Sequence, residues 1–268
     1  MAAGIGTTAP APAGAAPSSA PTVLDAVLGR SVQGRAVRVT RIGDPAAPTS
    51  VLVVGAIHGT EPAGTAVVRW LRSHPIRQPR VVLWLVHDLN PDGAAAGTRQ
   101  NARGVDLNRN FPDAWRPGGA PFGTYYPGPR PLSEPESRLA ARLIRRLNPD
   151  LTIWYHQALT LVDTGTVADP AVARRYARLS GLPARRLGFL PGVATRWQNR
   201  RDPGSSAFVV ELAGGPLGPA RTARGRRRAR RPRAARGLRP PWRLARSRRV
   251  PPRPGRRRRG GGRGGGAG

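Results

Sequence analysis

Short, continuously apolar segments separated by amphipathic ones are the feature that most limits the fold of this chain. Val51–Ile57 and Val81–His87 are almost entirely apolar, as expected of strands covered on both faces. Strands that alternate with helices predict an α/β sheet with helices on both faces. Further strands are predicted at Arg35–Ile42, Leu151–His156 and Ala207–Leu212, and helices at Glu61–Leu71, Ser133–Leu147 and Ala171–Leu179.

The segment Ser133–Leu147 carries two helix signals. Ser133 precedes Glu136 by three residues, the spacing of a capping box, so we expect the helix to begin at Ser133. Leucines recur at every fourth position from Leu139 onward and would form one apolar face.

The chain has 268 residues, no cysteine and no lysine, so all 45 basic residues are arginines. Its length suits one α/β domain of about 200–250 residues plus tails. The absence of cysteine excludes disulfides, thiolate zinc sites and a cysteine nucleophile. The absence of lysine excludes a Schiff base and a P-loop, whose motif requires lysine. Metal ligands must therefore be histidine, aspartate or glutamate.

Positive charge is concentrated near the end of the chain. The net charge is +31, and residues 221–268 contain 20 arginines and no acidic residue. Such a segment buries too little apolar surface to offset its chain entropy, so we expect it to be disordered. It is either an arginine-rich arm that binds nucleic acid or another polyanion, or a frameshifted translation of GC-rich DNA that begins near Gly218.

Residues 1–22 are rich in small residues and proline and are also expected to be disordered. They lack the basic region and the apolar run of a secretory signal. No segment reaches the ~18–20 apolar residues of a membrane span. The chain is therefore either cytoplasmic or exported through an unrecognised signal, and we expect a monomer with one catalytic domain at residues 23–220.

Two candidate metal ligands follow the first apolar strand. His58 and Glu61 come directly after Val51–Ile57, where open α/β sheets bind their ligands. A catalytic zinc ion commonly has three protein ligands, and two histidines with one glutamate are a known set. His87 and His156 each end a predicted strand, and spacing alone leaves the third ligand open between them.

Four motifs occur in a set order: His58-Gly-Thr-Glu61, Asn90-Pro-Asp-Gly93, the run from Arg99 to Pro112, and Phe208-Val-Val-Glu211. In this order they resemble the zinc metallocarboxypeptidase family. The short loops resemble its bacterial branch, which includes murein peptide amidases. The resemblance covers about residues 35–217 and implies a mixed, mostly parallel sheet and one zinc ion per chain.

The resemblance also implies roles for particular residues. His58, Glu61 and His156 match the zinc ligands, since His156 ends a strand in the family's Pro-Asp-Leu…His context. His87 then becomes a non-ligand. Glu211 matches the general base. Together these matches imply metal-assisted hydrolysis, in which Glu211 takes a proton from water and passes it to the leaving amine.

Three residues within the run from Arg99 to Pro112 match substrate-contacting positions. Arg99 matches the arginine that polarises the scissile carbonyl. Asn108 and Arg109 match the pair that holds the terminal carboxylate, and a planar guanidinium suits this role because it forms two parallel hydrogen bonds to a carboxylate. Asp106 is expected to anchor the loop through backbone hydrogen bonds.

Two features depart from the family pattern. Gly181–Ser206 contains no tyrosine, although many members have one there, so Phe189 or Trp197 is expected to line the pocket instead. After Leu217 the arginine-rich tail stands where the family has a helix that covers the sheet, so we expect this helix to be missing.

Arg196 lies where the family builds its side-chain pocket, and it would favour an acidic group such as the second carboxylate of diaminopimelate. The expected substrate is a murein peptide with a γ-D-Glu–diaminopimelate bond, or else a carboxypeptidase substrate. The alternatives are a deacylase of N-acyl amino acids, a protein that binds nucleic acid through its tail, and an inactive chain with an altered C-terminus.

Overall fold

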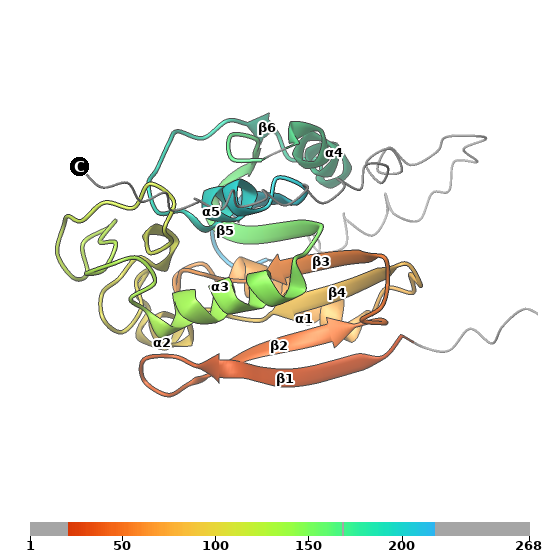
Figure 1. The fold of residues 1–268 in the computed structure, drawn as a ribbon, viewed down its shortest axis with the longest axis horizontal. Coiled ribbons are helices and arrows are strands. Elements are labelled where there is room, and N and C mark those ends of the chain that lie inside the picture. Colours follow the sequence, from red (N-terminus) through yellow and green to blue (C-terminus); the bar gives the residue numbers. More distant parts are fainter. Residues whose placement is uncertain (1–20, 168, 218–268) are drawn as a thin grey trace, which may run out of the picture. The chain divides into compact units, whose positions relative to one another are not determined.

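The structure is a computed structural model that describes residues 21–167 and 169–217 (Figure 1). The seven strands of its sheet are β1 (Val23–Arg30), β2 (Ala36–Ile42), β3 (Thr49–Val54), β4 (Val81–Val86), β5 (Leu151–Asp163), β6 (Ala184–Arg185) and β7 (Ser206–Ala213). The helices among these residues are α1 (Ala63–Ser73), α2 (Pro91–Ala96), α3 (Pro135–Leu147), α4 (Pro170–Ser180), α5 (Ala194–Arg201) and a 3₁₀ turn, η1 (Leu107–Arg109).

The sheet has the strand order β1-β2-β4-β3-β5-β6, and β7 also pairs with β5. Strand β3 runs parallel to β4 and β5, and β5 runs parallel to β6 and β7. Strands β1 and β2 are antiparallel to each other, and β2 is antiparallel to β4. The expected mixed, mostly parallel sheet is therefore confirmed. Beyond Ala158 the pairing of β5 with β7 becomes irregular.

Helices cover both faces of the sheet, as the sequence predicts. Leu52 and Val54 of β3 lie in one core layer with apolar side chains of α3 and α5. Val53, which points to the opposite face, lies in a second layer with side chains of α1 and α4. Figure 1 shows α3 lying across the sheet. The alternation along β3 explains why this strand is continuously apolar from Val51 to Val54.

The helix expected to begin at Ser133 begins instead at Pro135, so the predicted capping box is wrong. Glu134 occupies the N-cap position. Ser133 Oγ donates to Glu134 Oε1 (2.7 Å), and Glu136 Oε1 accepts from the backbone N–H of Val32 (3.0 Å). Both side chains therefore make other contacts, and Pro135 suits the first helical position because it has no N–H to satisfy.

The sequence does not predict β1, α2, α5 or β6. Strand β1 is largely exposed and lacks a continuous apolar run. The Asn90–Gly93 motif predicts a turn, and the structure extends this turn into α2, whose N-cap is Asn90. Asn90 Oδ1 accepts from the backbone N–H of Gly93 (2.9 Å).

The expected boundaries at residues 22/23 and 220/221 remain predictions. Residues 1–20 and 218–268 lie outside the described residues, and so does the region after Leu217 where the helix is expected to be missing. Within the described part of the chain, no helix has both the length and the apolar character needed to cross a membrane.

Gly64 lets α1 pack directly against the sheet. A Cβ atom at this position would lie 1.8 Å from the carbonyl oxygen of Gly55 and 2.4 Å from Cβ of Tyr155. We therefore expect Gly64→Ala to lower the free energy of unfolding by about 1–3 kcal/mol, measured by urea denaturation. Gly204→Ala is the control, because its Cβ would meet only Asp202 Oδ1, at 3.5 Å. An equal loss in both variants would contradict this account.

Asp88 should make the stability of the fold depend on pH. Burial raises the pKa of Asp88 from 3.8 to about 6. Between pH 3.8 and about 6, Asp88 is protonated in the folded chain but ionised in the unfolded chain, so the free energy of unfolding falls as the pH rises through this range. We expect Asp88→Asn to be more stable than wild type at pH 7 and nearly equal to it at pH 4, as measured by urea denaturation.

Asn at position 88 keeps an acceptor for the backbone N–H of Asn90, which donates to Asp88 Oδ1 (2.8 Å). Asp44→Asn controls for the loss of one negative charge, since the exposed Asp44 likewise accepts a backbone N–H. A stability difference between wild type and Asp88→Asn that is the same at both pH values would show that Asp88 is not responsible.

Candidate active site

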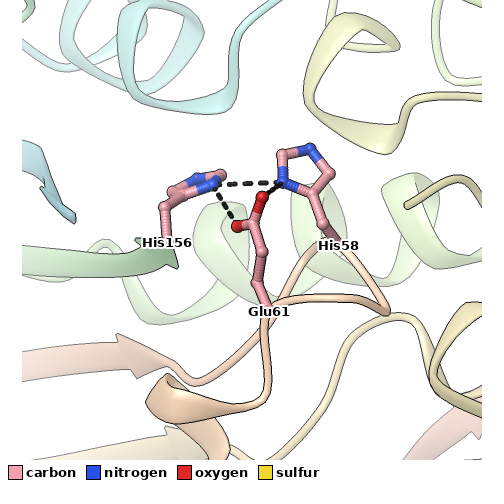
Figure 2. A group of neighbouring side chains, drawn as sticks. All are labelled: His58, Glu61 and His156. Carbon is pink, nitrogen blue, oxygen red and sulfur yellow. Dashed lines mark hydrogen bonds and ion pairs between the residues drawn. The ribbon is translucent and has the colours of Figure 1, made fainter. Parts of the chain in front are cut away.

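His58, Glu61 and His156 form a compact, buried group (Figure 2). One ligand atom from each residue lies within 4.8 Å of the other two. His58 Nδ1 is 2.8 Å from Glu61 Oε1, and His156 Nδ1 is 3.0 Å from Glu61 Oε2. The two Nδ1 atoms are 3.2 Å apart. Three electron-pair donors therefore converge at one point, which is the arrangement of a cation site.

The tight loop between β3 and α1 brings His58 and Glu61 together. The backbone N–H of Glu61 donates to the carbonyl of His58 (3.2 Å) and closes a turn between them. Gly59 allows this turn to lie against the start of α2, where a Cβ atom would come within 2.0 Å of the carbonyl carbon of Gly93. Pro62 follows at the N-cap of α1. The glycine and proline of this motif thus help direct both ligands to the same point.

Asp106, a fully buried carboxylate, holds His58 from the other side. Its Oδ1 is 3.0 Å from His58 Nε2 and accepts from the backbone N–H of Asn108 (2.9 Å). Its Oδ2 accepts from Nε and Nη2 of Arg99 (3.2 and 3.1 Å). The expectation that Asp106 anchors its loop is confirmed. The carboxylate also fixes the His58 ring so that Nδ1 faces Glu61, as outer-shell partners of metal-binding histidines do.

Opposite charges shift the pKa values of this group. Burial would lower the pKa of His58, but the carboxylates of Asp106 and Glu61 outweigh it and raise the pKa above its ordinary value. Burial would raise the pKa of both carboxyl groups, but His156 and His58 lower the pKa of Glu61, and His58 with Arg99 lowers that of Asp106, in both cases well below the ordinary range. Glu61 and Asp106 are therefore ionised at neutral pH, which suits a candidate metal ligand and the carboxylate that supports it.

Strand β5 supplies the third member of the group. β5 runs parallel to β3, so His156 emerges at the same edge of the sheet as the loop that carries His58. His87 follows β4 and lies apart from the group, where its Nε2 is 2.6 Å from Thr40 Oγ1. The structure therefore brings His156, and not His87, beside His58 and Glu61.

Glu211 lies next to this group on β7. It is the register partner of His156 in the parallel pairing of β5 and β7. The side chain is buried, and the backbone N–H of Leu159 donates to its Oε2 (3.4 Å). Burial, with a smaller contribution from Glu61, raises the pKa of Glu211 above its ordinary value. Such a carboxylate is suited to accept a proton and later return it.

The eight residues that the family resemblance matches to metal-binding, catalytic or substrate-binding positions line one cavity of about 190 Å³. Strands β5 and β7, the loop after β3, the loop before η1 and the segment between β6 and α5 contribute to its wall. The structure therefore brings together residues that are far apart in the sequence: His58, Glu61, Arg99, Asn108, Arg109, His156, Arg196 and Glu211.

Arg99 connects the two buried carboxylates. Its Nη1 donates to Glu61 Oε1 (3.0 Å), while Nε and Nη2 donate to Asp106. Its carbonyl accepts from Asn90 Nδ2 (3.1 Å) and from the backbone N–H of Gly59 (3.3 Å). The Arg99 side chain is 28% exposed, so the guanidinium borders the cavity directly beside the candidate metal ligands.

Arg109 is almost fully buried, yet its guanidinium is only partly satisfied. Its Nη1 donates to the carbonyl of Asn108 (2.7 Å), and the group lies 4.7 Å from the ring centre of Tyr125. Its Nε has no hydrogen-bond partner among the described residues. Asn108 Oδ1 accepts from the backbone N–H of Ala194 (3.0 Å), which ties it to the start of α5. Arg109 thus retains the donor capacity that a carboxylate receptor needs.

Arg196 is held at the rim of the cavity. Its Nε donates to Asp113 Oδ2 (2.7 Å), and its guanidinium lies 4.1 Å from the ring centre of Phe189. Of the two residues expected to line the pocket in place of the tyrosine, Phe189 does line the cavity. Trp197 does not, because α5 turns it into the core, where its ring centre is 5.5 Å from that of Phe111.

The sequence does not single out Gln157, Asp163, Thr166 or Arg186, which line the same cavity. The backbone N–H of Gln157 donates to Glu61 Oε2 (3.2 Å). Gln157 could have been predicted from the sequence, because it directly follows the candidate ligand His156. Asp163 and Thr166 give no local signal, because their placement depends on the course of β5 and the loop beyond it.

The donor set fits a zinc ion. Two imidazole nitrogens and one carboxylate oxygen are the ligands of zinc in a class of hydrolases, which leave a further position for water or substrate. The ligand group borders a cavity, and Asp106 supplies the outer-shell carboxylate that such a site usually has.

Residues 17–164 match the family described as zinc carboxypeptidase. The chain belongs to the zinc carboxypeptidase family. The matched segment includes His58, Glu61 and His156, whereas Arg196 and Glu211 lie beyond it. Membership of this family implies zinc as the metal.

Two curated proteins illustrate the similarity. Murein peptide amidase A of Escherichia coli strain K12 is 34% identical over 128 residues, which cover 42% of this chain and 51% of that protein. The carboxypeptidase N catalytic chain of Rattus norvegicus is 34% identical over 167 residues, which cover 45% of this chain and 35% of that protein. The chain thus spans about half or less of the length of these relatives.

A solved structure shares the fold. The crystal structure of murein-tripeptide amidase MpaA from Escherichia coli O157 superposes with a TM-score of 0.58 at 24% identity, over 71% of this chain and 84% of that chain.

We expect the purified wild-type chain to retain about one zinc ion per molecule after dialysis. His156→Ala should weaken zinc binding by at least the ~10–100-fold that loss of an outer-shell partner costs, because it removes a ligand. Zinc content and chelator competition measure both. His87→Ala is the matched control. If His156→Ala kept its zinc affinity and His87→Ala lost it, the third ligand would be His87 rather than His156.

Proposed function

We propose that this chain is a zinc-dependent hydrolase of peptide or amide bonds next to a free carboxylate. The observation that carries the proposal is the cavity lined by the His58–Glu61–His156 group, by Glu211 and by the Asn108–Arg109 pair. Metal ligands, a proton acceptor and a carboxylate receptor are the parts that this reaction requires. Membership of the zinc carboxypeptidase family supports the same reaction class.

The terminal carboxylate of the substrate binds Arg109, with Asn108 beside it. Arg109 is buried and has an unused N–H group, so an incoming carboxylate meets a donor that little water screens. Fixing the carboxylate at this end of the cavity presents the adjacent amide to the metal ligands and Glu211. This positioning is a large part of what an enzyme of this kind supplies.

His58, Glu61 and His156 would hold the zinc ion. When bound, zinc supplies a Lewis acid that polarises the amide carbonyl and acidifies water. Glu211 accepts the proton of the attacking water and then donates it to the nitrogen of the leaving group. Its raised pKa helps it to hold the proton between these two steps. Arg99 stabilises the negative charge that develops on the carbonyl oxygen.

The preferred substrate is a murein peptide that is cleaved between γ-D-Glu and diaminopimelate. The similarity to murein peptide amidase A supports this choice. So does the placement of Arg196, which lines the cavity and is held by Asp113 where it can meet a second carboxylate.

We expect Glu211→Gln to lower kcat for γ-D-Glu–diaminopimelate hydrolysis by about 10²–10⁴-fold, because glutamine cannot accept the proton. Zinc content should stay at the wild-type value, since Glu211 is outside the ligand group. The measurement is the release of free diaminopimelate by zinc-loaded protein.

Glu134→Gln is the matched control, a buried glutamate that the structure places away from the cavity. Full activity in Glu211→Gln would remove Glu211 from the reaction. No hydrolysis by the wild type, with zinc bound, would overturn the proposed substrate. Amidation of the terminal carboxylate should also abolish cleavage, and if it does not, Arg109 is not its receptor.

A further inference from the structure

Asp163 is a buried carboxylate in the wall of the active-site cavity that has no cationic partner. Its exposed fraction is 2%. Oδ1 accepts from the backbone N–H groups of Gly165 (2.7 Å) and Leu187 (3.0 Å), whereas the nearest partner of Oδ2 is Thr166 Oγ1 at 3.5 Å. Among the described residues, none forms an ion pair with Asp163. Buried carboxylates usually form an ion pair with a cationic side chain, and this chain has 45 arginines that could supply one.

Two arginines line the same cavity as Asp163 but form no ion pair with it. Gly165 lies between the carboxylate and Arg186, since a Cβ at Gly165 would come within 3.1 Å of Asp163 Oδ1 and 3.0 Å of Arg186 Cγ. Arg186 is exposed, and it makes no hydrogen bond or ion pair with a described residue. Arg196 Nε instead donates to Asp113. The cavity wall therefore contains, besides Glu61 and Glu211, a buried carboxylate without a cationic partner, and Arg186 and Arg196 line the same cavity.

We propose that Asp163 is a specificity-determining residue that receives the ammonium group on the side chain of the substrate's C-terminal residue. The pairing would supply the cation that the buried Oδ2 lacks. Arg186 and Arg196 are placed to meet a carboxylate next to that ammonium. The pocket is thus complementary to a side chain that ends as a zwitterion, and it would disfavour side chains that lack the ammonium, because these would leave Asp163 buried and unpaired.

This inference rests on the proposed function for the bond that is cleaved, but the pocket can be tested separately. Asp163→Asn is the informative variant, because asparagine keeps an oxygen for the two backbone N–H groups and replaces Oδ2 by a donor. Asp202→Asn is the matched control: Asp202 follows α5, lies outside the cavity and also accepts a backbone N–H, that of Gly204 (3.2 Å).

The first measurement is kcat/KM of zinc-loaded protein for γ-D-glutamyl dipeptides that end in diaminopimelate, lysine, 2-aminopimelate or norleucine. We expect wild type and Asp202→Asn to prefer diaminopimelate over 2-aminopimelate, which lacks only the side-chain ammonium, by at least about 10-fold. Asp163→Asn should lose that preference, because its kcat/KM for the diaminopimelate substrate falls while its kcat/KM for the 2-aminopimelate substrate does not. A preference that persists in Asp163→Asn would overturn the assignment.

The second measurement does not depend on catalysis. Free diaminopimelate and free 2-aminopimelate are titrated into each variant by calorimetry. We expect diaminopimelate to bind wild type at least about 10-fold more tightly than it binds Asp163→Asn, with Asp202→Asn equal to wild type. Equal binding to all three variants would overturn the role of Asp163. If wild type cleaves no dipeptide but binds diaminopimelate through Asp163, the proposed reaction fails and the pocket assignment stands.

Discussion

Parallel pairing of β5 with β3 on one side and with β7 on the other is the constraint on which the rest of the molecule depends. It carries His156 to the sheet edge where the loop after β3 presents His58, and it sets Glu211 beside His156. The same register sends alternate side chains of β3 into two core layers. Because a slip of one residue would turn every side chain of β5 to the opposite face, packing of the core and alignment of the site are enforced together.

A second level of order comes from the carboxylate of Asp106. It bonds the ring of His58, the guanidinium of Arg99 and the backbone of Asn108, so a single side chain links the candidate metal ligands to the loop that carries the proposed carboxylate receptor. Such a fully satisfied buried network is rigid, since each partner would lose its hydrogen bond on moving away from the others.

The fold class could be predicted from segments such as Val51–Ile57, because burial on both faces leaves few alternatives for a continuous apolar run. Two of the three candidate metal ligands could be predicted because His58 and Glu61 lie in one compact motif, whereas spacing left the third open between His87 and His156 and only the family resemblance favoured His156. The role of Asp163 could not be predicted, since its burial and its lack of a cation depend on segments distant in the sequence, such as the backbone of Leu187. The cap expected at Ser133 was wrong for a related reason: distant partners engage the side chains that the local pattern assigns to the helix start.

The spread of the site over the sheet has a consequence for the order of events during synthesis. When β4 has been made, the growing chain offers only His58 and Glu61, a two-donor loop. The third donor arrives with β5, once this strand has docked against β3, and the carboxylate of Glu211 arrives last, on β7. The three candidate metal ligands are therefore all present in a nascent chain before Glu211 is made. Until β7 has been added, the unfinished molecule lacks the group to which the proposed function assigns proton transfer.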